Sequence, residues 1–149
     1  MQATPLEQEV SRFPAGLRLA ERKPRVLLVE DDADMRRLVA VVLRQDGCEV
    51  VEVDSGVAML RRIESTLWRD AAEYFDVIVS DIHMPDVTAL EVLSNLRYRN
   101  IATPVILMTA YGNDQAHNDT RALGAVALLD KPLDWNQLRA AVRKAVRLS

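Results

Sequence analysis

Short apolar runs alternate with segments of helical hydrophobic spacing over most of the chain. Four of the runs are apolar at nearly every position and are bounded by polar residues, the pattern of strands buried on both faces of a sheet, and a fifth run mixes valine with glutamate. Between the runs, apolar residues recur three and four positions apart, which marks one face of a helix. The predicted strands cover residues 26–30, 49–53, 77–80, 104–108 and 126–129.

The predicted helices follow the strands one by one. The first has its apolar stripe over 35–43 and ends at Gly47. The second is long and is predicted to run from Val57 to Tyr74. The remaining helices are predicted over 90–96, 113–123 and 135–146. Strands and helices that alternate in this way favour an α/β fold, with a parallel sheet, helices on both of its faces and right-handed crossovers.

Residues 1–23 differ from the rest of the chain. Pro5, Pro14 and Gly16 stand among charged residues there, and no apolar run opens a strand. A chain of 149 residues suits one hydrophobic core. We therefore expect one domain over 24–149 and an N-terminal extension over 1–23, which we interpret as a loosely docked tail.

Composition and charge narrow the class of protein. The net charge of −3 gives no basic footprint for nucleic acid, and the single cysteine, Cys48, excludes an internal disulfide and a thiolate metal cluster. No apolar run is long enough to cross a bilayer, and the N-terminus lacks the apolar segment of a signal peptide. We expect a cytoplasmic protein that binds neither nucleic acid nor membrane. A row of Arg139, Arg143 and Arg147 on the last helix is interpreted as a solvated face.

Polar side chains come at the ends of four predicted strands. Glu30 and Asp31 stand at the end of the first strand, Asp81 follows the third, Thr109 the fourth and Lys131 the fifth. Ligands of a parallel sheet bind beyond the carboxyl ends of its strands, so we expect these side chains to meet at one edge. Carboxylates packed together repel one another unless a cation lies among them.

This set of side chains suits phosphoryl transfer. Glu30, Asp31 and Asp81 offer hard oxygen ligands for Mg²⁺, which binds through carboxylates, water and phosphate. Aspartate is a known covalent nucleophile for phosphoryl groups, and Asp81 stands apart from the acid pair, which makes it the candidate. Lys131 can neutralise charge on the transferring group, and the hydroxyl of Thr109 can donate a hydrogen bond to it.

Four stretches in order, VLLVEDD, VIVSDIHMPD, PVILMTA and GAVALLDKPL, resemble the response regulator receiver domain of two-component signal transduction. The resemblance covers residues 24–148. It implies the flavodoxin-like receiver fold, a three-layer, doubly wound, five-stranded parallel sheet with strand order 2-1-3-4-5. It also implies a phosphoprotein of a signalling or phosphorelay pathway. Such a protein is not an enzyme with a separate substrate, because it catalyses only its own phosphotransfer and dephosphorylation.

Carried over residue by residue, the resemblance implies that Asp81 accepts a phosphoryl group from a histidine kinase or a histidine phosphotransfer protein. Glu30, Asp31, Asp81 and the backbone carbonyl of His83 match the positions that bind Mg²⁺, with Asp31 the more direct ligand of the acid pair. Asp32 is then a neighbour that caps the first helix.

The resemblance also assigns roles around the phosphoryl group. Thr109 matches the hydroxyl residue that follows this group and switches the loop, and Lys131 matches the lysine that pairs with it. The bond from Lys131 to Pro132 is expected to be cis, as is usual in the family. His83 and Tyr111 match positions that border the path of attacking water, where the two rings either orient water or merely shield the site.

Three departures from the family pattern affect the expected switch. Leu128 stands where the family has an aromatic residue that reports phosphorylation, which puts the conformational read-out in question. Thr88 and Ala89 replace an aspartate–glycine pair, so the loop after Asp81 is expected to take another path. The segment of the second helix is longer than usual, and its Trp68 and Phe75 either form a docking surface or cover the helix's own apolar stripe.

The leading hypothesis is a stand-alone phosphoryl-accepting switch with a downstream protein partner, although a receiver cut from a longer chain fits the sequence equally. A homodimer is possible. A phosphatase or mutase of the haloacid-dehalogenase kind would need a general acid two residues after the nucleophile, where this chain has His83. A receiver-like interaction module that acts without phosphorylation-driven switching is the remaining alternative, favoured by Leu128 and Ala89.

Overall fold

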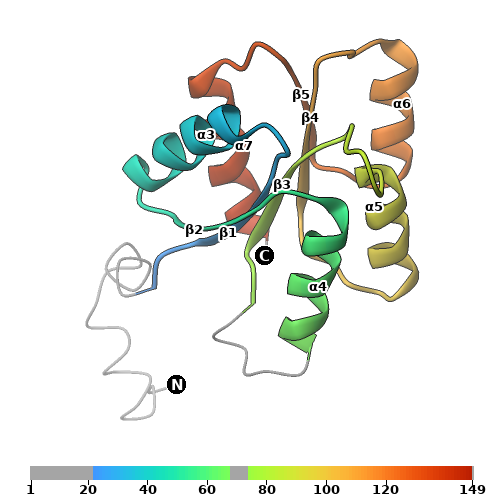
Figure 1. Cartoon of the computed structure of the whole chain (residues 1–149), viewed down its shortest axis with the longest axis horizontal. Helices are drawn as coiled ribbons and strands as arrows, with labels where there is room; N and C mark the ends of the chain where they lie inside the picture. Colours follow the sequence, from blue (N-terminus) through green and yellow to red (C-terminus); the bar gives the residue numbers. More distant parts are fainter. Residues whose placement is uncertain (1–21, 68–73, 149) are drawn as a thin grey trace, which may run out of the picture.

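The computed structural model describes residues 22–67 and 74–148, and its strands and helices alternate as the sequence predicts (Figure 1). The strands are β1 (Arg25–Val29), β2 (Glu49–Val53), β3 (Val77–Asp81), β4 (Val105–Thr109) and β5 (Ala127–Asp130). The helices are α3 (Ala33–Gln45), α4 (Gly56–Leu67), α5 (Ala89–Tyr98), α6 (Asp114–Ala122) and α7 (Trp135–Leu148). Within these residues, no helix is both long enough and apolar enough to span a membrane.

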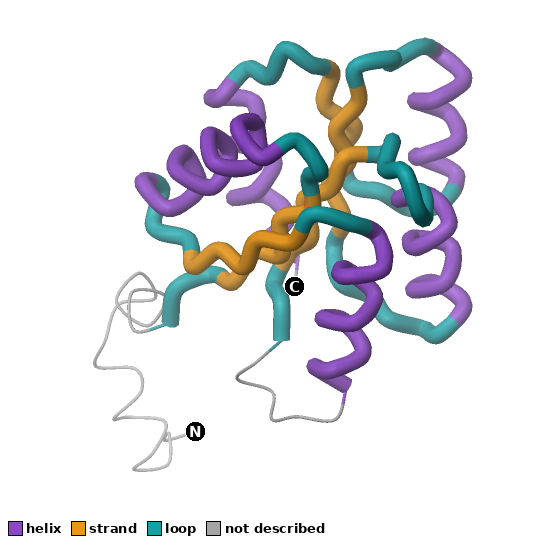
Figure 2. Tube along the Cα trace, in the orientation of Figure 1, coloured by secondary structure: helices purple, strands orange, loops and turns teal. Residues whose placement is uncertain are grey.

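The five strands form one parallel sheet in the order β2-β1-β3-β4-β5, which confirms the expected strand order. The sheet lies at the centre of the molecule with helices on both sides (Figure 2). After β1 the chain moves outward to β2, and it then returns past β1 to form β3. The carboxyl ends of β1 and β3 therefore meet at the topological switch point, where ligands of such sheets bind.

Two apolar layers hold the helices against the sheet. Val26 and Leu28 belong to the cluster that includes the buried faces of α3 and α7, whereas Leu27 and Val29 belong to the cluster with α4 and α5. Consecutive strand residues point to opposite faces of the sheet. Because helices cover both faces, all four side chains are fully buried. Burial of each such side chain contributes about 1.5–3 kcal/mol, so the central strands form a rigid base for the residues at their ends.

The second helix does not reach Tyr74. Helix α4 is described over Gly56–Leu67, residues 68–73 lie outside the described residues, and Tyr74 is not helical, so the prediction of a helix that reaches Tyr74 is wrong. Phe75 is only 9% exposed and packs in the cluster with α4 and α5, with the guanidinium of Arg25 5.2 Å from its ring centroid. Phe75 is therefore a core residue rather than part of a docking surface. Trp68 and the extension before Arg22 lie outside the described residues.

The loop after Asp81 leads into α5 through a helix cap. Thr88 is the N-cap of α5, and its hydroxyl oxygen accepts a hydrogen bond from the backbone N–H of Glu91 at 3.2 Å. Ala89 is the first helical residue. Ala89 needs no positive φ here, because among the described residues the non-glycine position with positive φ is Asn100. Threonine at this position suits an N-cap well.

The basic row on α7 is not simply a solvated face. The guanidinium of Arg143 forms two hydrogen bonds with the carboxylate of Asp46, at 2.9 and 2.5 Å, and so joins α7 to the end of α3. Arg139 donates instead to the side-chain oxygen of Asn136 on its own helix. The Arg143 side chain is nevertheless 64% exposed, so it lies on the expected solvated face while its bidentate pair with the carboxylate fixes its position.

Candidate functional site

Four polar residues lie at the carboxyl edge of the sheet. Glu30 directly follows β1, Asp81 and Thr109 are the last residues of β3 and β4, and Lys131 directly follows β5. The register of β1 and β3 pairs the last residue of β1 with Ser80, so Glu30 and Asp81 stand one step further along neighbouring strands. Short strands of matched length thus bring the side chains to a single edge.

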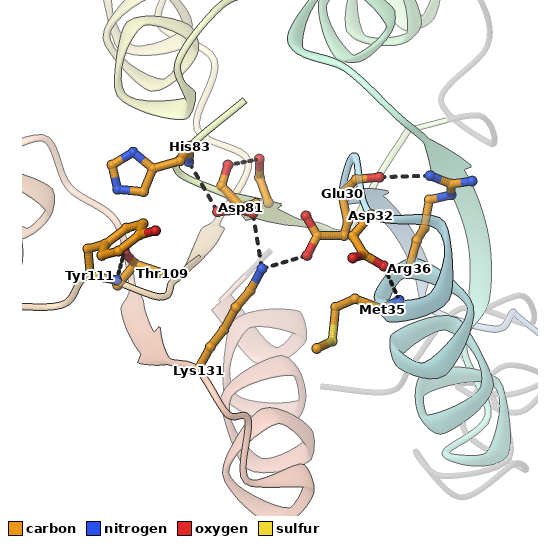
Figure 3. Close-up of polar contacts among 10 residues, drawn as sticks. Glu30, Asp32, Met35, Arg36, Asp81, His83, Thr109, Tyr111 and Lys131 are labelled. Atoms are coloured by element: carbon orange, nitrogen blue, oxygen red, sulfur yellow. Dashed lines mark hydrogen bonds and ion pairs between the residues drawn. The ribbon is translucent and has the colours of Figure 1, made fainter. Parts of the chain in front are cut away.

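The ammonium group of Lys131 lies between two carboxylates (Figure 3). Its Nζ is 2.5 Å from Oε1 of Glu30 and 3.0 Å from Oδ2 of Asp81. The Glu30 side chain is fully buried, and those of Asp81 and Lys131 are 10% and 17% exposed. Charges removed from water to this extent are stable only when they are paired, and here one cation faces two anions. The backbone carries Lys131 into this position through a cis bond to Pro132, as expected.

Burial and charge shift the protonation of this cluster. Burial raises the pKa of Glu30 to about 7, an effect that the hydrogen bond from Lys131 opposes and the neighbouring carboxylate of Asp81 reinforces. Burial alone would lower the pKa of Lys131, but its hydrogen bonds and attraction to Glu30 and Asp81 raise it overall. The lysine therefore stays charged, while Glu30 is near its midpoint at neutral pH.

Three carboxylates at this edge fit a hydrated divalent cation. Glu30, Asp31 and Asp81 each offer one oxygen, and these oxygens all lie within 4.8 Å of one another. Oε2 of Glu30 is buried and has no hydrogen-bond partner within the described structure, an arrangement that calls for an ion or a water. Asp31 is exposed, which leaves room for the water ligands that Mg²⁺ retains. The donor set therefore fits Mg²⁺.

Backbone and side-chain contacts hold the acidic loop after β1. Arg36 donates to the backbone carbonyl of Glu30 at 2.9 Å, and its guanidinium is 3.6 Å from the carboxylate of Glu52 on β2. Asp32 caps α3 by accepting a hydrogen bond from the N–H of Met35 at 2.9 Å, as expected. The role of Arg36 was not predicted from the sequence, since nothing around a single arginine on a helix indicates which backbone carbonyl it will contact.

The nucleophile candidate is also oriented by its own strand and loop. The backbone N–H of His83 donates to Oδ1 of Asp81 at 3.1 Å, and the hydroxyl of Ser80 donates to the backbone carbonyl of Asp81 at 2.9 Å. Because Lys131 occupies the other carboxylate oxygen, the rotation of the Asp81 side chain is restricted from both sides. A carboxylate held in this way is preorganised for attack on a group above the sheet edge.

Thr109 and two rings border the site. The hydroxyl oxygen of Thr109, fully buried, accepts a hydrogen bond from the N–H of Tyr111 at 3.0 Å. A hydroxyl that accepts one hydrogen bond can still donate its own proton. The rings of His83 and Tyr111 meet edge to face, with centroids 5.5 Å apart and an interplanar angle of 76°. Both rings are exposed, so they form the rim of the site.

A model of the response regulator receiver domain matches residues 26–143, which include every residue of the site described above. The chain belongs to this family. As a receiver domain it is part of the response regulators of two-component systems, and the haloacid-dehalogenase alternative is set aside. That class would place its nucleophile after the first strand, whereas the aspartate here ends β3.

Curated relatives of this receiver are longer regulators. The response regulator protein PmrA of Pseudomonas aeruginosa is 38% identical over 125 residues, which cover 83% of this chain and 52% of PmrA. The regulatory protein AtoC of Escherichia coli is 31% identical over 124 residues, which cover 83% of this chain and 25% of AtoC. The chain thus spans between a quarter and about half of the length of these relatives.

Solved receiver structures share the fold over most of their length. The receiver domain of the Francisella response regulator 1452 has a TM-score of 0.76 and 25% identity, covering 85% of this chain and 98% of that one. The chemotaxis response regulator CheY4 of Vibrio cholerae has a TM-score of 0.70 and 26% identity, covering 83% of this chain and 98% of that one. The sheet and its helices are therefore those of a receiver.

The expected switch position of the receiver lies beside a groove. Leu128 sits in β5 opposite Leu107 of β4 and is partly buried in the cluster with α4 and α5. It borders a groove of about 430 Å³ between α6 and α7. Alanines form much of the α7 side, and Arg121 and Lys144 add positive charge. The small side chains on α7 leave this groove open, and Leu128 is one of the residues that line it.

Proposed function

We propose that this receiver is a phosphoryl-accepting signalling switch, in which Asp81 takes a phosphoryl group from a histidine kinase or a histidine phosphotransfer protein. The observation that carries the proposal is the placement of Lys131 between Glu30 and Asp81, at 2.5 and 3.0 Å. This arrangement joins a carboxylate nucleophile, a cation and an acid pair at the switch point of the sheet. Membership of the receiver family supports the same reaction.

In the proposed transfer, a carboxylate oxygen of Asp81 attacks phosphorus, and the bond from phosphorus to the donor's imidazole nitrogen breaks with its electron pair left on nitrogen. The product is an acyl phosphate on Asp81. Lys131, already within hydrogen-bonding distance of Asp81, then pairs with a phosphoryl oxygen, and the hydroxyl of Thr109 donates to another. His83 holds the carboxylate through its backbone N–H.

We propose that Glu30, Asp31, Asp81 and the backbone carbonyl of His83 hold Mg²⁺. When bound, Mg²⁺ supplies positive charge that offsets the carboxylates and the phosphoryl oxygens. The unpartnered Oε2 of Glu30 and the close spacing of the three carboxylates support this assignment. Arg36 and the Asp32 cap keep the backbone of the acidic loop in place for it.

The rim residues are proposed to set the lifetime of the acyl phosphate. Hydrolysis needs a water that approaches phosphorus from outside the sheet edge. The rings of His83 and Tyr111 pack against each other on the exposed rim of that edge, which supports shielding of the phosphoryl group over orientation of water. Loss of either ring would then speed dephosphorylation.

The wider assignments are proposals of the same kind. Residues 24–149 would form the receiver and residues 1–23 an extension to it. The protein would act in the cytoplasm, where its family meets histidine kinases, without direct contact with nucleic acid or membrane. A downstream protein, or a second copy in a homodimer, would bind the face formed by α6, β5 and α7, whose groove beside Leu128 carries Arg121 and Lys144.

A receiver-like module that binds its partner without phosphorylation-driven switching is the second candidate, and Leu128 is the observation that favours it. Incubation with Mg²⁺ and acetyl phosphate, followed by intact-mass measurement, tests the first candidate by detecting one added phosphoryl group. Size-exclusion chromatography of the phosphorylated sample then separates the two. An adduct that changes neither oligomeric state nor partner binding favours the module.

A further inference from the structure

The carboxylate of Asp86 links two segments that are far apart in the sequence. Asp86 lies in the loop between β3 and α5, 30 residues after the start of α4. One of its oxygens accepts a hydrogen bond from the N–H of Gly56 at 3.1 Å, and the other accepts from the N–H of Val57 at 2.9 Å. These N–H groups belong to the first turn of α4, where no carbonyl of the helix can satisfy them.

The loop lies directly on the start of this helix. A Cβ atom at Gly56 would be 2.6 Å from the backbone carbonyl oxygen of Val87 and 2.9 Å from the Cβ of Val87. Glycine is thus required for the loop to approach so closely. A separate cap serves the next N–H of the turn, because the hydroxyl oxygen of Ser55 accepts from Ala58 at 3.1 Å. Asp86 and Ser55 share one helix end, but only Asp86 belongs to the loop.

The two hydrogen bonds that Asp86 accepts from Gly56 and Val57 form a tether between the loop and α4. This tether completes the attachment of the loop that follows Asp81. At its start, the N–H of His83 donates to the carboxylate of Asp81 at 3.1 Å. Met84 is 8% exposed and packs in the core cluster with α4 and α5. At the end of the loop, the N–H of Ala89 donates to the carbonyl of Ile82 at 3.2 Å. The peptide of His83 is therefore held by anchors on both sides.

Charge favours the tether in its ionised form. The backbone N–H of Val57, together with those of Val87 and Gly56, lowers the pKa of the Asp86 carboxyl. A carboxylate at a helix N-terminus is also stabilised by the helix dipole. The tether therefore persists throughout the neutral range in which a phosphoryl-transfer site works.

We propose that Asp86 is a positioning residue, which fixes the loop after Asp81 on the N-terminus of α4 and thereby presents the backbone of His83 to the divalent cation. The inference rests on the proposed function for the cation itself. The role of Asp86 is indirect: it holds the loop and does not touch the metal. Its loss lowers metal affinity because the loop must then be ordered when the cation binds.

Isothermal titration calorimetry of the whole chain with Mg²⁺, which measures the affinity for the cation, tests the role of Asp86. Asp86→Ala is expected to weaken Mg²⁺ binding about tenfold, as loss of a supporting residue outside the ligand set does. Gly56→Ala leaves the carboxylate intact but displaces the loop, and it is expected to weaken binding as well. Ser55→Ala removes the other cap of the same helix end and serves as the matched control. It lowers the thermal midpoint of unfolding without changing Mg²⁺ affinity.

Two outcomes overturn the inference alone: wild type and Asp86→Ala bind Mg²⁺ equally, or Ser55→Ala weakens binding as much as Asp86→Ala does. The second outcome would mean that only capping of α4 matters. If Asp86→Ala does not fold, Asp86→Asn decides, since it keeps one acceptor oxygen and is expected to give an intermediate affinity. If the wild-type chain itself binds no Mg²⁺, the proposed function fails and the inference with it.

Discussion

The Nζ of Lys131 lies 2.5 Å from Oε1 of Glu30, a residue 101 positions earlier in the chain. The contact joins the end of β5 to the end of β1 across the ends of the two strands between them. Asp81, at the end of β3, meets the same ammonium group at 3.0 Å. The three side chains therefore act as one buried charge cluster, and changes to one of them are felt by the other two.

Removal of the lysine should destabilise the metal-free protein. Lys131→Ala leaves two buried carboxylates without a cation, which is expected to lower the free energy of unfolding by about 3 kcal/mol. Added Mg²⁺ should restore part of the loss, because it supplies positive charge at the same carboxylates. Urea unfolding with and without Mg²⁺ measures both effects. Lys144→Ala, at an exposed position of α7, is the control and should change the free energy by less than about 0.5 kcal/mol.

Stability and metal binding should both depend on pH through Glu30. Its pKa rises from 4.5 to about 7 on folding, so the folded metal-free protein binds more protons than the unfolded chain between these values. Stability of the metal-free protein should therefore fall as pH rises through this window. Mg²⁺ competes with the proton, so its affinity should rise from pH 6 toward pH 8, about one unit either side of the shifted value.

Glu30→Gln is the control for this pH dependence, because it has nearly the same shape and cannot ionise. The variant should bind Mg²⁺ more weakly, with an affinity that varies much less over the same pH range. Calorimetry in two buffers of different ionisation enthalpy measures the protons released on binding. A wild-type protein that releases none near neutral pH would contradict the assignment of the titrating group.

Phe75 should behave as a core residue. Phe75→Ala removes a ring that is 9% exposed and packed in the cluster with α4 and α5, and it is expected to cost about 3–4 kcal/mol of unfolding free energy. Tyr98→Ala, at a side chain that is 90% exposed, should cost less than about 0.5 kcal/mol. Thermal or urea unfolding compares the two. Equal stability of both variants would mean that Phe75 is not part of the core.

Apolar periodicity and strand order were enough to predict the sheet and the edge where the polar residues gather. The runs around Leu27 and Ile78 are apolar on both faces because helices cover the sheet on both sides. Their burial can therefore be predicted from the local sequence. Glu30, Asp81 and Lys131 could be placed together because parallel strands end at a common edge. The cap by Asp32 could also be predicted, since its partner, the N–H of Met35, lies only three positions further along the chain.

Contacts that depend on the packing of distant segments were not predicted. The apolar spacing favours a helix up to Tyr74, which is not helical, because periodicity does not show where a chain leaves the helix. The tether from Asp86 to Gly56 joins residues 30 positions apart. Arg143 meets Asp46 across 97 positions. These contacts depend on how α3, α4 and α7 pack on the sheet, and the local sequence pattern does not predict that packing.

Intact-mass spectrometry after incubation with acetyl phosphate tests the central claim, that Asp81 accepts a phosphoryl group in a Mg²⁺-dependent reaction. The wild-type chain should gain the mass of one phosphoryl group with Mg²⁺ and little without it. Asp81→Asn should gain none, whereas the control Asp34→Asn, at a side chain that is 94% exposed, should match wild type. No adduct on the wild-type chain, or the same adduct on Asp81→Asn, would contradict the account.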